Sequence, residues 1–158
     1  MPVKKSHFRT ELAQVAEVCL GYRARVAARL VTRHYNAHFA GIGVTAVQFA
    51  LLAGIELGNK PTIAALAAQA GSDGTTVTRN IGLLEERGLV IGQGGRGRSG
   101  KRLSLTPAGE ELLARALPVW RGAYAALLGR IGRAEAGRGL AFLVTLGDAA
   151  LSLVQSGD

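Results

Sequence analysis

Hydrogen-bonding and cationic side chains gather in one predicted helix that follows a tight turn at Gly71. They are Thr75, Thr76, Thr78, Arg79 and Asn80. Hydroxyl and amide groups can exchange hydrogen bonds with base edges or phosphates, and a guanidinium can pair with guanine or phosphate. Because an α-helix fits the major groove of DNA, these residue types indicate a nucleic-acid-binding helix. The alternative is a solvated helix face that binds nothing.

A second group of cations lies further along the chain, in a glycine-rich segment. Residues 92–102 hold four basic residues, five glycines and no acid, and they contribute half of the net charge of +8. The flanking residues 89–91 and 102–106 have the patterns of two strands, so we predict a hairpin with a basic tip. The cations predicted to contact DNA are Arg96, Arg98, Lys101 and Arg102. We expect the first two in the minor groove and the last two on phosphates, with a merely solubilising loop as the alternative.

Signals for helix ends place both groups in one motif. Thr62 is a predicted N-cap for a short helix that ends at Gly71, and Asp73 is a predicted N-cap for the next helix. We include both caps among the predicted DNA-binding residues. Apolar residues recur in the second helix at the spacing of one buried face, at Val77, Ile81 and Leu84. Two short helices joined by a tight turn and followed by a basic hairpin indicate a winged helix-turn-helix.

Longer helices are predicted on both sides of this motif, from apolar residues spaced by three or four positions. They cover residues 12–39, a segment that begins at 46, residues 107–127 and about 135–154. Thr45 and Gln48 match a capping box at the start of the second, and Gly129 and Gly132 are expected to break the chain between the last two. The fold class is therefore mainly α with a small β-hairpin wing.

The length of 158 residues fits one domain, predicted to cover residues 1–158. Within it, 44–106 is the predicted winged helix-turn-helix, and 1–40 together with 107–158 form a helical dimerisation region. The long helices carry more apolar surface than a winged-helix core of about 60 residues can cover. We therefore predict a homodimer, with an intramolecular helical bundle as the alternative.

Nucleotide and enzyme chemistry find little support in the spacing of residues. Gly92, Gly94 and Gly97 match a dinucleotide-binding pattern and 95–101 match a phosphate loop, yet a strand follows where both patterns need the start of a helix. No Ser/His/Asp, paired-carboxylate or metal-ligand set occurs at a usable spacing. We predict that the protein is not an enzyme and that it has no cofactor and no metal site.

The expected location is the cytoplasm, without a membrane span. The N-terminal residues lack the apolar core of a signal peptide, because polar residues interrupt it. Residues 35–55 carry no formal charge, but asparagine, histidine, glutamine and glycines dilute their apolar character. A single cysteine is compatible with a reducing compartment.

The order of these elements and several stretches of sequence resemble the MarR family of bacterial transcriptional regulators. The stretches are Val44-Thr45-Ala46-Val47-Gln48-Phe49, Thr62-Ile63-Ala64-Ala65-Leu66-Ala67, Thr75-Thr76-Val77-Thr78-Arg79, Leu84-Glu85-Glu86-Arg87-Gly88-Leu89-Val90 and Leu105-Thr106-Pro107-Ala108-Gly109. The resemblance covers about residues 10–155. It implies a homodimer whose two recognition helices enter successive major grooves of a pseudo-palindromic operator in double-stranded DNA. The implied function is that of a sequence-specific regulator, a repressor relieved by a small-molecule effector.

One departure from the family pattern concerns the wing. The usual Asp-x-Arg of the family falls on Gly97-Arg98-Ser99, so both the acid that braces the wing and the arginine that it braces are missing. Arg96 or Arg98 can substitute, but with less preorganisation. We expect a poorly ordered wing without DNA and a more salt-dependent DNA contact. A winged-helix interaction module with weak or no DNA binding is the second hypothesis.

The resemblance also implies a site for a small aromatic or anionic effector. The residues that could line it are His34, Tyr35, His38, Trp120 and Tyr124. They offer an apolar wall with polar tips, although core packing explains the aromatic rings equally well. Two histidines four residues apart also suit a metal ion, but they have too few partners.

Cys19 raises the alternative of a redox sensor. The sensing cysteine of the peroxide-responsive branch of the family would fall near Gly21, and Cys19 lies on the apolar face of its predicted helix. A buried structural cysteine is therefore favoured over a reactive one.

Overall fold

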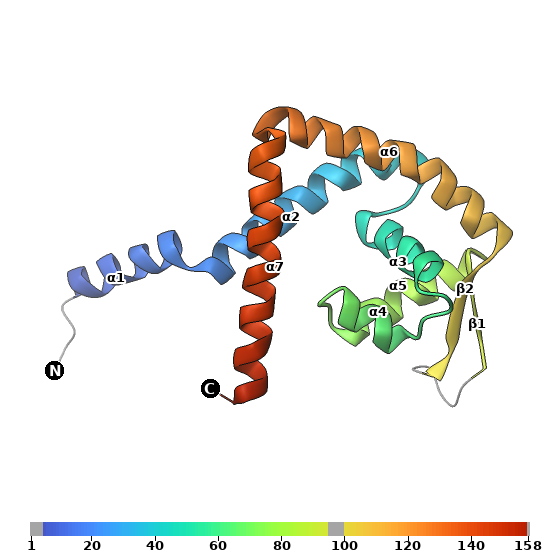
Figure 1. Ribbon diagram of the computed structural model, residues 1–158, viewed down its shortest axis with the longest axis horizontal. Coiled ribbons are helices and arrows are strands. Elements are labelled where there is room, and N and C mark those ends of the chain that lie inside the picture. The colour runs from blue at the N-terminus through green and yellow to red at the C-terminus, as the bar shows by residue number, and fades with distance from the viewer. Residues whose placement is uncertain (1–4, 95–99, 158) are drawn as a thin grey trace. The chain divides into compact units, whose positions relative to one another are not determined.

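The protein is mainly helical and has one two-stranded antiparallel sheet (Figure 1). The computed structural model describes residues 5–94 and 100–157. Its elements are α1 (Lys5–Val18), α2 (Leu20–Phe39), the 3-10 helix η1 (Ala40–Ile42), α3 (Ala46–Leu57), α4 (Ile63–Gln69), α5 (Gly74–Glu86), β1 (Val90–Gln93), β2 (Arg102–Leu105), α6 (Pro107–Ile131) and α7 (Arg133–Ser156). The predicted fold class is confirmed.

The chain divides into two compact units, Met1–Leu117 and Pro118–Asp158. The first holds the helix-turn-helix and the hairpin, and the second holds the end of α6 and all of α7. The boundary lies at Pro118, inside α6, where proline removes one backbone hydrogen-bond donor from the helix. The finer division into a DNA-binding region at 44–106 and a dimerisation region stays a prediction.

The starts of the helices lie where capping signals predict them. The Thr45 hydroxyl accepts a hydrogen bond from Gln48 N at 3.2 Å, and Thr45 N donates to Gln48 Oε1 at 3.1 Å, which completes the capping box of α3. Ala65 N donates to the Thr62 hydroxyl at 3.1 Å at the start of α4. Such contacts lie within three residues of one another, so local sequence suffices to predict them.

A core of apolar side chains from several elements fixes the orientation of α5. The most deeply buried large side chains of the first unit are Phe39, Leu52, Ile81, Leu84, Val90 and Leu103. Val77, Ile81 and Leu84 are buried as their spacing predicts. Because these three lie on one side of α5, the opposite side is left to face solvent.

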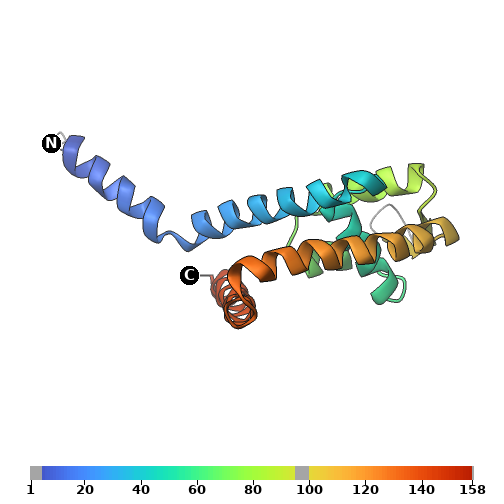
Figure 2. The same ribbon diagram turned by 90° about the horizontal axis from the view of Figure 1, so that it is seen from above.

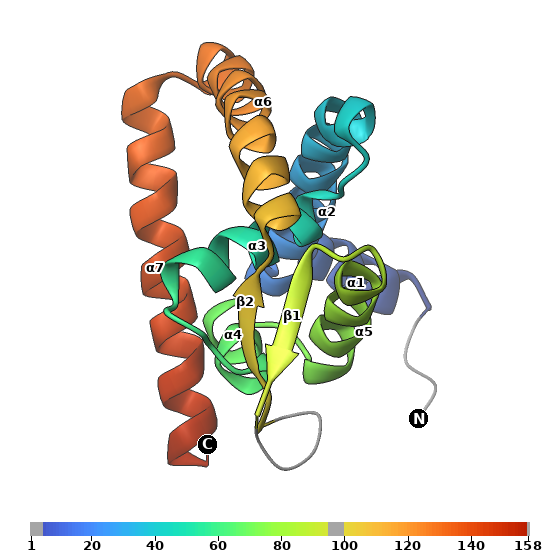
Figure 3. The same ribbon diagram turned by 90° about the vertical axis from the view of Figure 1, so that its right-hand side faces the viewer.

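The hairpin is attached at its base to both helices of the motif. In the antiparallel register, Val90 pairs with Leu105 and Gln93 with Arg102, and Figure 3 shows β1 running beside α5. Leu103 N donates to Pro61 O at 3.0 Å, and the Thr106 hydroxyl donates to Gly88 O at 2.7 Å. The base of the wing is therefore tied to the turn before α4 and to the turn after α5.

Two predicted helix boundaries are wrong. The helix expected at 12–39 is two helices, because Cys19 has ψ 106° and leaves the helical conformation (Figure 2). Gly21 lies beside this break and lowers the helix propensity there. Gly129 does not break α6, since one glycine costs only about 1 kcal/mol inside a helix. The break occurs at Gly132, whose φ of 82° favours glycine.

The long helices leave large apolar surfaces uncovered. In α1 and α2 the exposed apolar side chains include Leu12, Val15, Tyr22 and Leu30. Among its described residues, α7 has none that is buried, and α7 is long and apolar enough to span a membrane by length and composition. Helices α2 and α3 pass the same criterion only as a pair bent by 80°, yet Leu51, Leu52 and Ile55 of α3 belong to the core.

Candidate DNA-binding site

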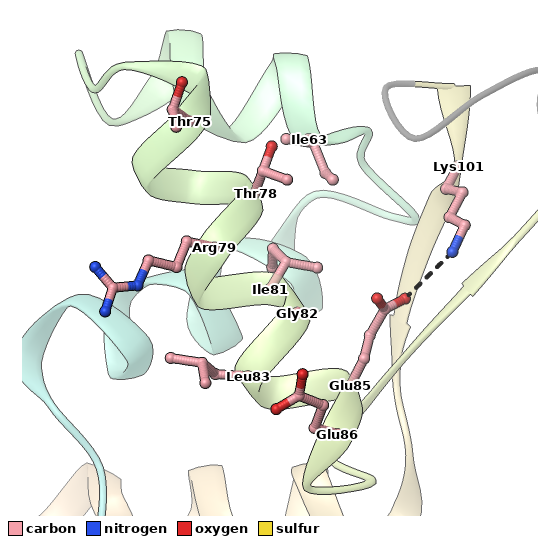
Figure 4. A pocket seen from close by; sticks show the side chains of 10 residues that line it. All are labelled: Ile63, Thr75, Thr78, Arg79, Ile81, Gly82, Leu83, Glu85, Glu86 and Lys101. Atoms are coloured by element: carbon pink, nitrogen blue, oxygen red, sulfur yellow. Dashed lines mark ion pairs between the residues drawn. The ribbon is translucent and has the colours of Figure 1, made fainter.

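The outward face of α5 borders a groove of about 550 Å³ between this helix and the stem of the wing (Figure 4). The residues that line it are Ile63, Thr75, Thr78, Arg79, Ile81, Gly82, Leu83, Glu85, Glu86 and Lys101. Thr75 and Arg79 are exposed, and Thr78 is half-buried. The structure thus brings three of the predicted base-reading residues and one predicted phosphate contact to one surface.

Three other predicted site residues interact with one another at the start of α5. The Asp73 carboxylate accepts hydrogen bonds from Thr75 N at 2.7 Å and from the Thr76 hydroxyl at 2.8 Å. Asn80 Nδ2 donates to Thr76 O at 2.9 Å. These side chains hold the first turns of α5 in place, so their established contacts are with the helix itself.

The pKa of Asp73 is lower than its ordinary value of 3.8. The largest cause is the hydrogen bond from the Thr76 side chain, followed by the one from the Thr75 backbone, because both stabilise the ionised carboxylate. A carboxylate with a depressed pKa stabilises the folded state above the pKa of the unfolded chain, and this contribution is lost as the pH falls through the folded pKa.

Asp73→Ala is therefore expected to lower the Tm by an amount that depends on pH. The difference from the wild type should be constant near neutral pH and should shrink once the pH falls below 3.8. Thermal unfolding followed by circular dichroism between neutral pH and about pH 3 measures this difference. Thr62→Ala is the matched control, since it removes an uncharged cap whose effect does not titrate. A pH-independent effect of Asp73→Ala would contradict the assignment.

Arg79 is the cation at the centre of the exposed face. Its side chain projects to the side of α5 that is turned away from Lys101 (Figure 4). Within the described part of the chain, its guanidinium forms no hydrogen bond and no ion pair. Five N–H donors are therefore directed to solvent at a position where a ligand can approach.

The cations of the wing differ in their surroundings. Lys101 Nζ lies 3.9 Å from Glu85 Oε1, and Arg102 Nη1 donates to Lys60 O at 3.4 Å. Arg102 also forms an isolated β-bridge with Thr62. Arg96 and Arg98, together with the expectation of a poorly ordered tip, lie outside the described residues.

Sequence reasoning missed the acidic part of this surface. Glu85 and Glu86 line the same groove as Thr78 and Arg79. Each acid lies seven positions after one of those residues, which is two helical turns, so helical spacing alone could have indicated it.

The predicted effector residues form two aromatic groups in different units of the chain. On α2, the rings of His34 and His38 lie 4.5 Å apart, and His34 contacts Tyr35 edge-on at 5.6 Å. On α6, Trp120 and Tyr124 stack at 5.3 Å. Each group packs within its own helix, and a pocket shared by the two groups stays a prediction.

Metal and redox sites receive no further support from the geometry. Among the residues that the structure describes, no group of three or more His, Cys, Asp or Glu side chains could hold a metal ion. Cys19 is partly exposed at the break between α1 and α2, and is not the buried residue of a continuous helix that its spacing favours.

A helix-turn-helix followed by a hairpin with a basic stem defines a winged-helix DNA-binding protein. A model of the MarR family matches residues 42–99. The chain is 35% identical to the M. tuberculosis transcriptional regulator MosR, in a structure with DNA, with a TM-score of 0.75 over 85% of this chain and 97% of that one. The chain therefore belongs to the MarR family of transcriptional regulators.

More distant relatives share the fold. The structure of E. coli MarR with operator DNA is 19% identical, with a TM-score of 0.73 over 84% of this chain and 96% of that one. The repressor CouR bound to a 23-mer DNA duplex is 24% identical, with a TM-score of 0.73 over 85% and 95% of the two chains. No relative was found among proteins of curated function. Membership of the family makes the protein a DNA-binding transcriptional regulator, and the family comprises regulators and not enzymes.

Proposed function

We propose that the protein is a cytoplasmic homodimeric repressor that binds a pseudo-palindromic operator and is released from it by a small effector. The α5 helix of each protomer enters the major groove, where Thr75, Thr78 and Arg79 contact base edges. Lys101 and Arg102 contact phosphates on the flank. The observation that carries the proposal is the uncommitted Arg79 guanidinium on the exposed face of α5, beside a basic wing stem.

The dimer follows from the exposed apolar surfaces and from the geometry of an operator. Exposed leucines, valines and aromatic residues along α1, α2 and α7 are too extensive for the surface of a soluble monomer. Two symmetric copies bury such surfaces against one another and present two α5 helices to half-sites one helical turn apart.

The effector of this proposal is an aromatic or anionic small molecule. The aromatic groups at His34, Tyr35 and His38 and at Trp120 and Tyr124 support it, because stacked rings with polar edges suit such a ligand. CouR, a related structure, has been determined with p-coumaroyl-CoA bound.

The test is selection of bound sequences from a pool of random DNA duplexes, followed by fluorescence anisotropy on the selected duplex. Arg79→Ala should weaken binding about tenfold or more and relax the preference at one position of each half-site, since a bidentate base contact contributes about 1–3 kcal/mol. Arg115→Ala is the matched control, because it removes an exposed arginine of α6 that does not line the groove. If no duplex is enriched, or if both variants bind alike, the proposal fails and an interaction module is favoured.

A further inference from the structure

An ion pair ties the stem of the wing to the recognition helix. Lys101 Nζ lies 3.9 Å from Glu85 Oε1, and the two side chains are 40% and 33% exposed (Figure 4). Glu85 belongs to the last turn of α5, and Lys101 directly precedes β2. The other ties of β2, through Arg102, Leu103 and Thr106, lie closer to the base of the hairpin. This pair is therefore the described tie of β2 that is nearest to the tip.

Gly92 on β1 leaves the space that the pair occupies. A Cβ atom at this position would lie 2.9 Å from Glu85 Oε1 and 2.9 Å from Lys101 Cδ. Both distances are below normal van der Waals contact, so any side chain at 92 displaces the pair. Gly92 has no positive φ, so the lack of a side chain is what this position requires. Residues from α5, β1 and the start of β2 thus meet at one point.

We propose that Glu85 and Gly92 are positioning residues for the wing, in place of the Asp-x-Arg pair that is absent at Gly97-Arg98-Ser99. Glu85 holds the Lys101 ammonium between α5 and the wing, where it faces a phosphate beside the major groove. Gly92 gives the pair its seat. This inference rests on the proposed DNA binding, and it turns a lysine predicted from charge alone into a contact of defined direction.

Simple electrostatics predict the opposite effect for the same acid. A carboxylate beside a phosphate-binding groove repels DNA, so its removal strengthens binding unless the carboxylate has a positioning role. Glu86 supplies the comparison. It lines the same groove, is exposed, and makes no ion pair within the described part of the chain. Glu85→Gln and Glu86→Gln change the charge equally at neighbouring positions, and only the first removes the tie.

The first measurement is binding of each variant dimer to the selected duplex by fluorescence anisotropy. Glu86→Gln should bind as tightly as the wild type or more tightly. Glu85→Gln and Gly92→Ala should bind about three- to tenfold more weakly, since an exposed pair contributes up to about fivefold and each dimer has two. In a Lys101→Met background, Glu85→Gln should no longer weaken binding. If Glu85→Gln binds as tightly as Glu86→Gln, or if Gly92→Ala has no effect, the inference is wrong.

The second measurement is hydrogen exchange in the free protein, which needs no DNA. Backbone amides of 90–93 and 102–105 should exchange faster in Glu85→Gln and Gly92→Ala than in the wild type and Glu86→Gln. The protein should still fold in Gly92→Ala, because the atoms that a Cβ meets are near the ends of flexible side chains. If the wild type binds no duplex, the proposed function fails, and unchanged exchange in the variants would still refute the brace by itself.

Discussion

The double variant Leu140→Glu, Leu143→Glu is expected to be monomeric and to lose operator binding by about 100-fold or more. On α7, an apolar stripe at helical spacing comprises Leu140, Leu143, Val144, Leu151 and Val154, all exposed in the single chain. In the proposed dimer a second copy covers this stripe. Four unpaired carboxylates would then be buried per dimer, and each costs several kcal/mol. Analytical ultracentrifugation measures the mass, and anisotropy measures the DNA affinity.

The matched control places the same charges on another face of the same helix. Thr145→Glu, Ser152→Glu changes two exposed positions that flank Asp148, so this face already carries a carboxylate. The control should remain dimeric and bind the operator. Circular dichroism should show the same helix content for both double variants. A stable dimer of the Leu140→Glu, Leu143→Glu protein would show that the interface uses a different surface.

Gly109→Ala is expected to destabilise the protein by about 3 kcal/mol. A Cβ atom at 109 would lie 2.1 Å from Leu89 O and 3.1 Å from Leu89 C. This clash is with backbone, and Leu89 O also accepts a hydrogen bond from Thr106 N at 3.1 Å. The start of α6 must therefore move away from the segment that leads into β1. Urea unfolding should show a lower midpoint, and operator binding should weaken as the base of the wing shifts.

Gly122→Ala is the control on the same helix with the opposite expected sign. No atom lies within 4 Å of a Cβ built at 122. Replacing an exposed glycine inside a helix by alanine should stabilise the protein by about 0.5–1 kcal/mol, because alanine loses less backbone entropy. If the two variants have equal midpoints, close packing at Gly109 is not what requires a glycine there.

Local signals in the sequence predicted most of the fold. The caps at Thr45, Thr62 and Asp73 were predictable because each side chain bonds a backbone group two or three residues away. The buried face of α5 followed from helical spacing. The break at Cys19 was not predictable in this way, because no proline or cap marks it and the apolar spacing continues across it.

The candidate site was predictable in its residue types but only partly in its contacts. Threonine, arginine and asparagine on one helix beside basic residues in a hairpin indicated DNA from chemistry alone. The structure separates them into residues that face the groove, such as Arg79, and residues that hold the helix start, such as Asp73 and Thr76. Direction around a helix follows from its packing against the core, which residue type does not reveal.

By itself, the sequence determined that the chain forms a winged helix-turn-helix with a basic wing, since caps, turns and helical spacing act over a few residues. Only the tertiary structure decided what faces what. The pairing of Glu85 with Lys101 joins residues on different elements, and it depends on the register of β1 and β2 and on the absence of a side chain at Gly92. Contacts of this kind arise when separate elements pack together, so no local pattern in the chain specifies them.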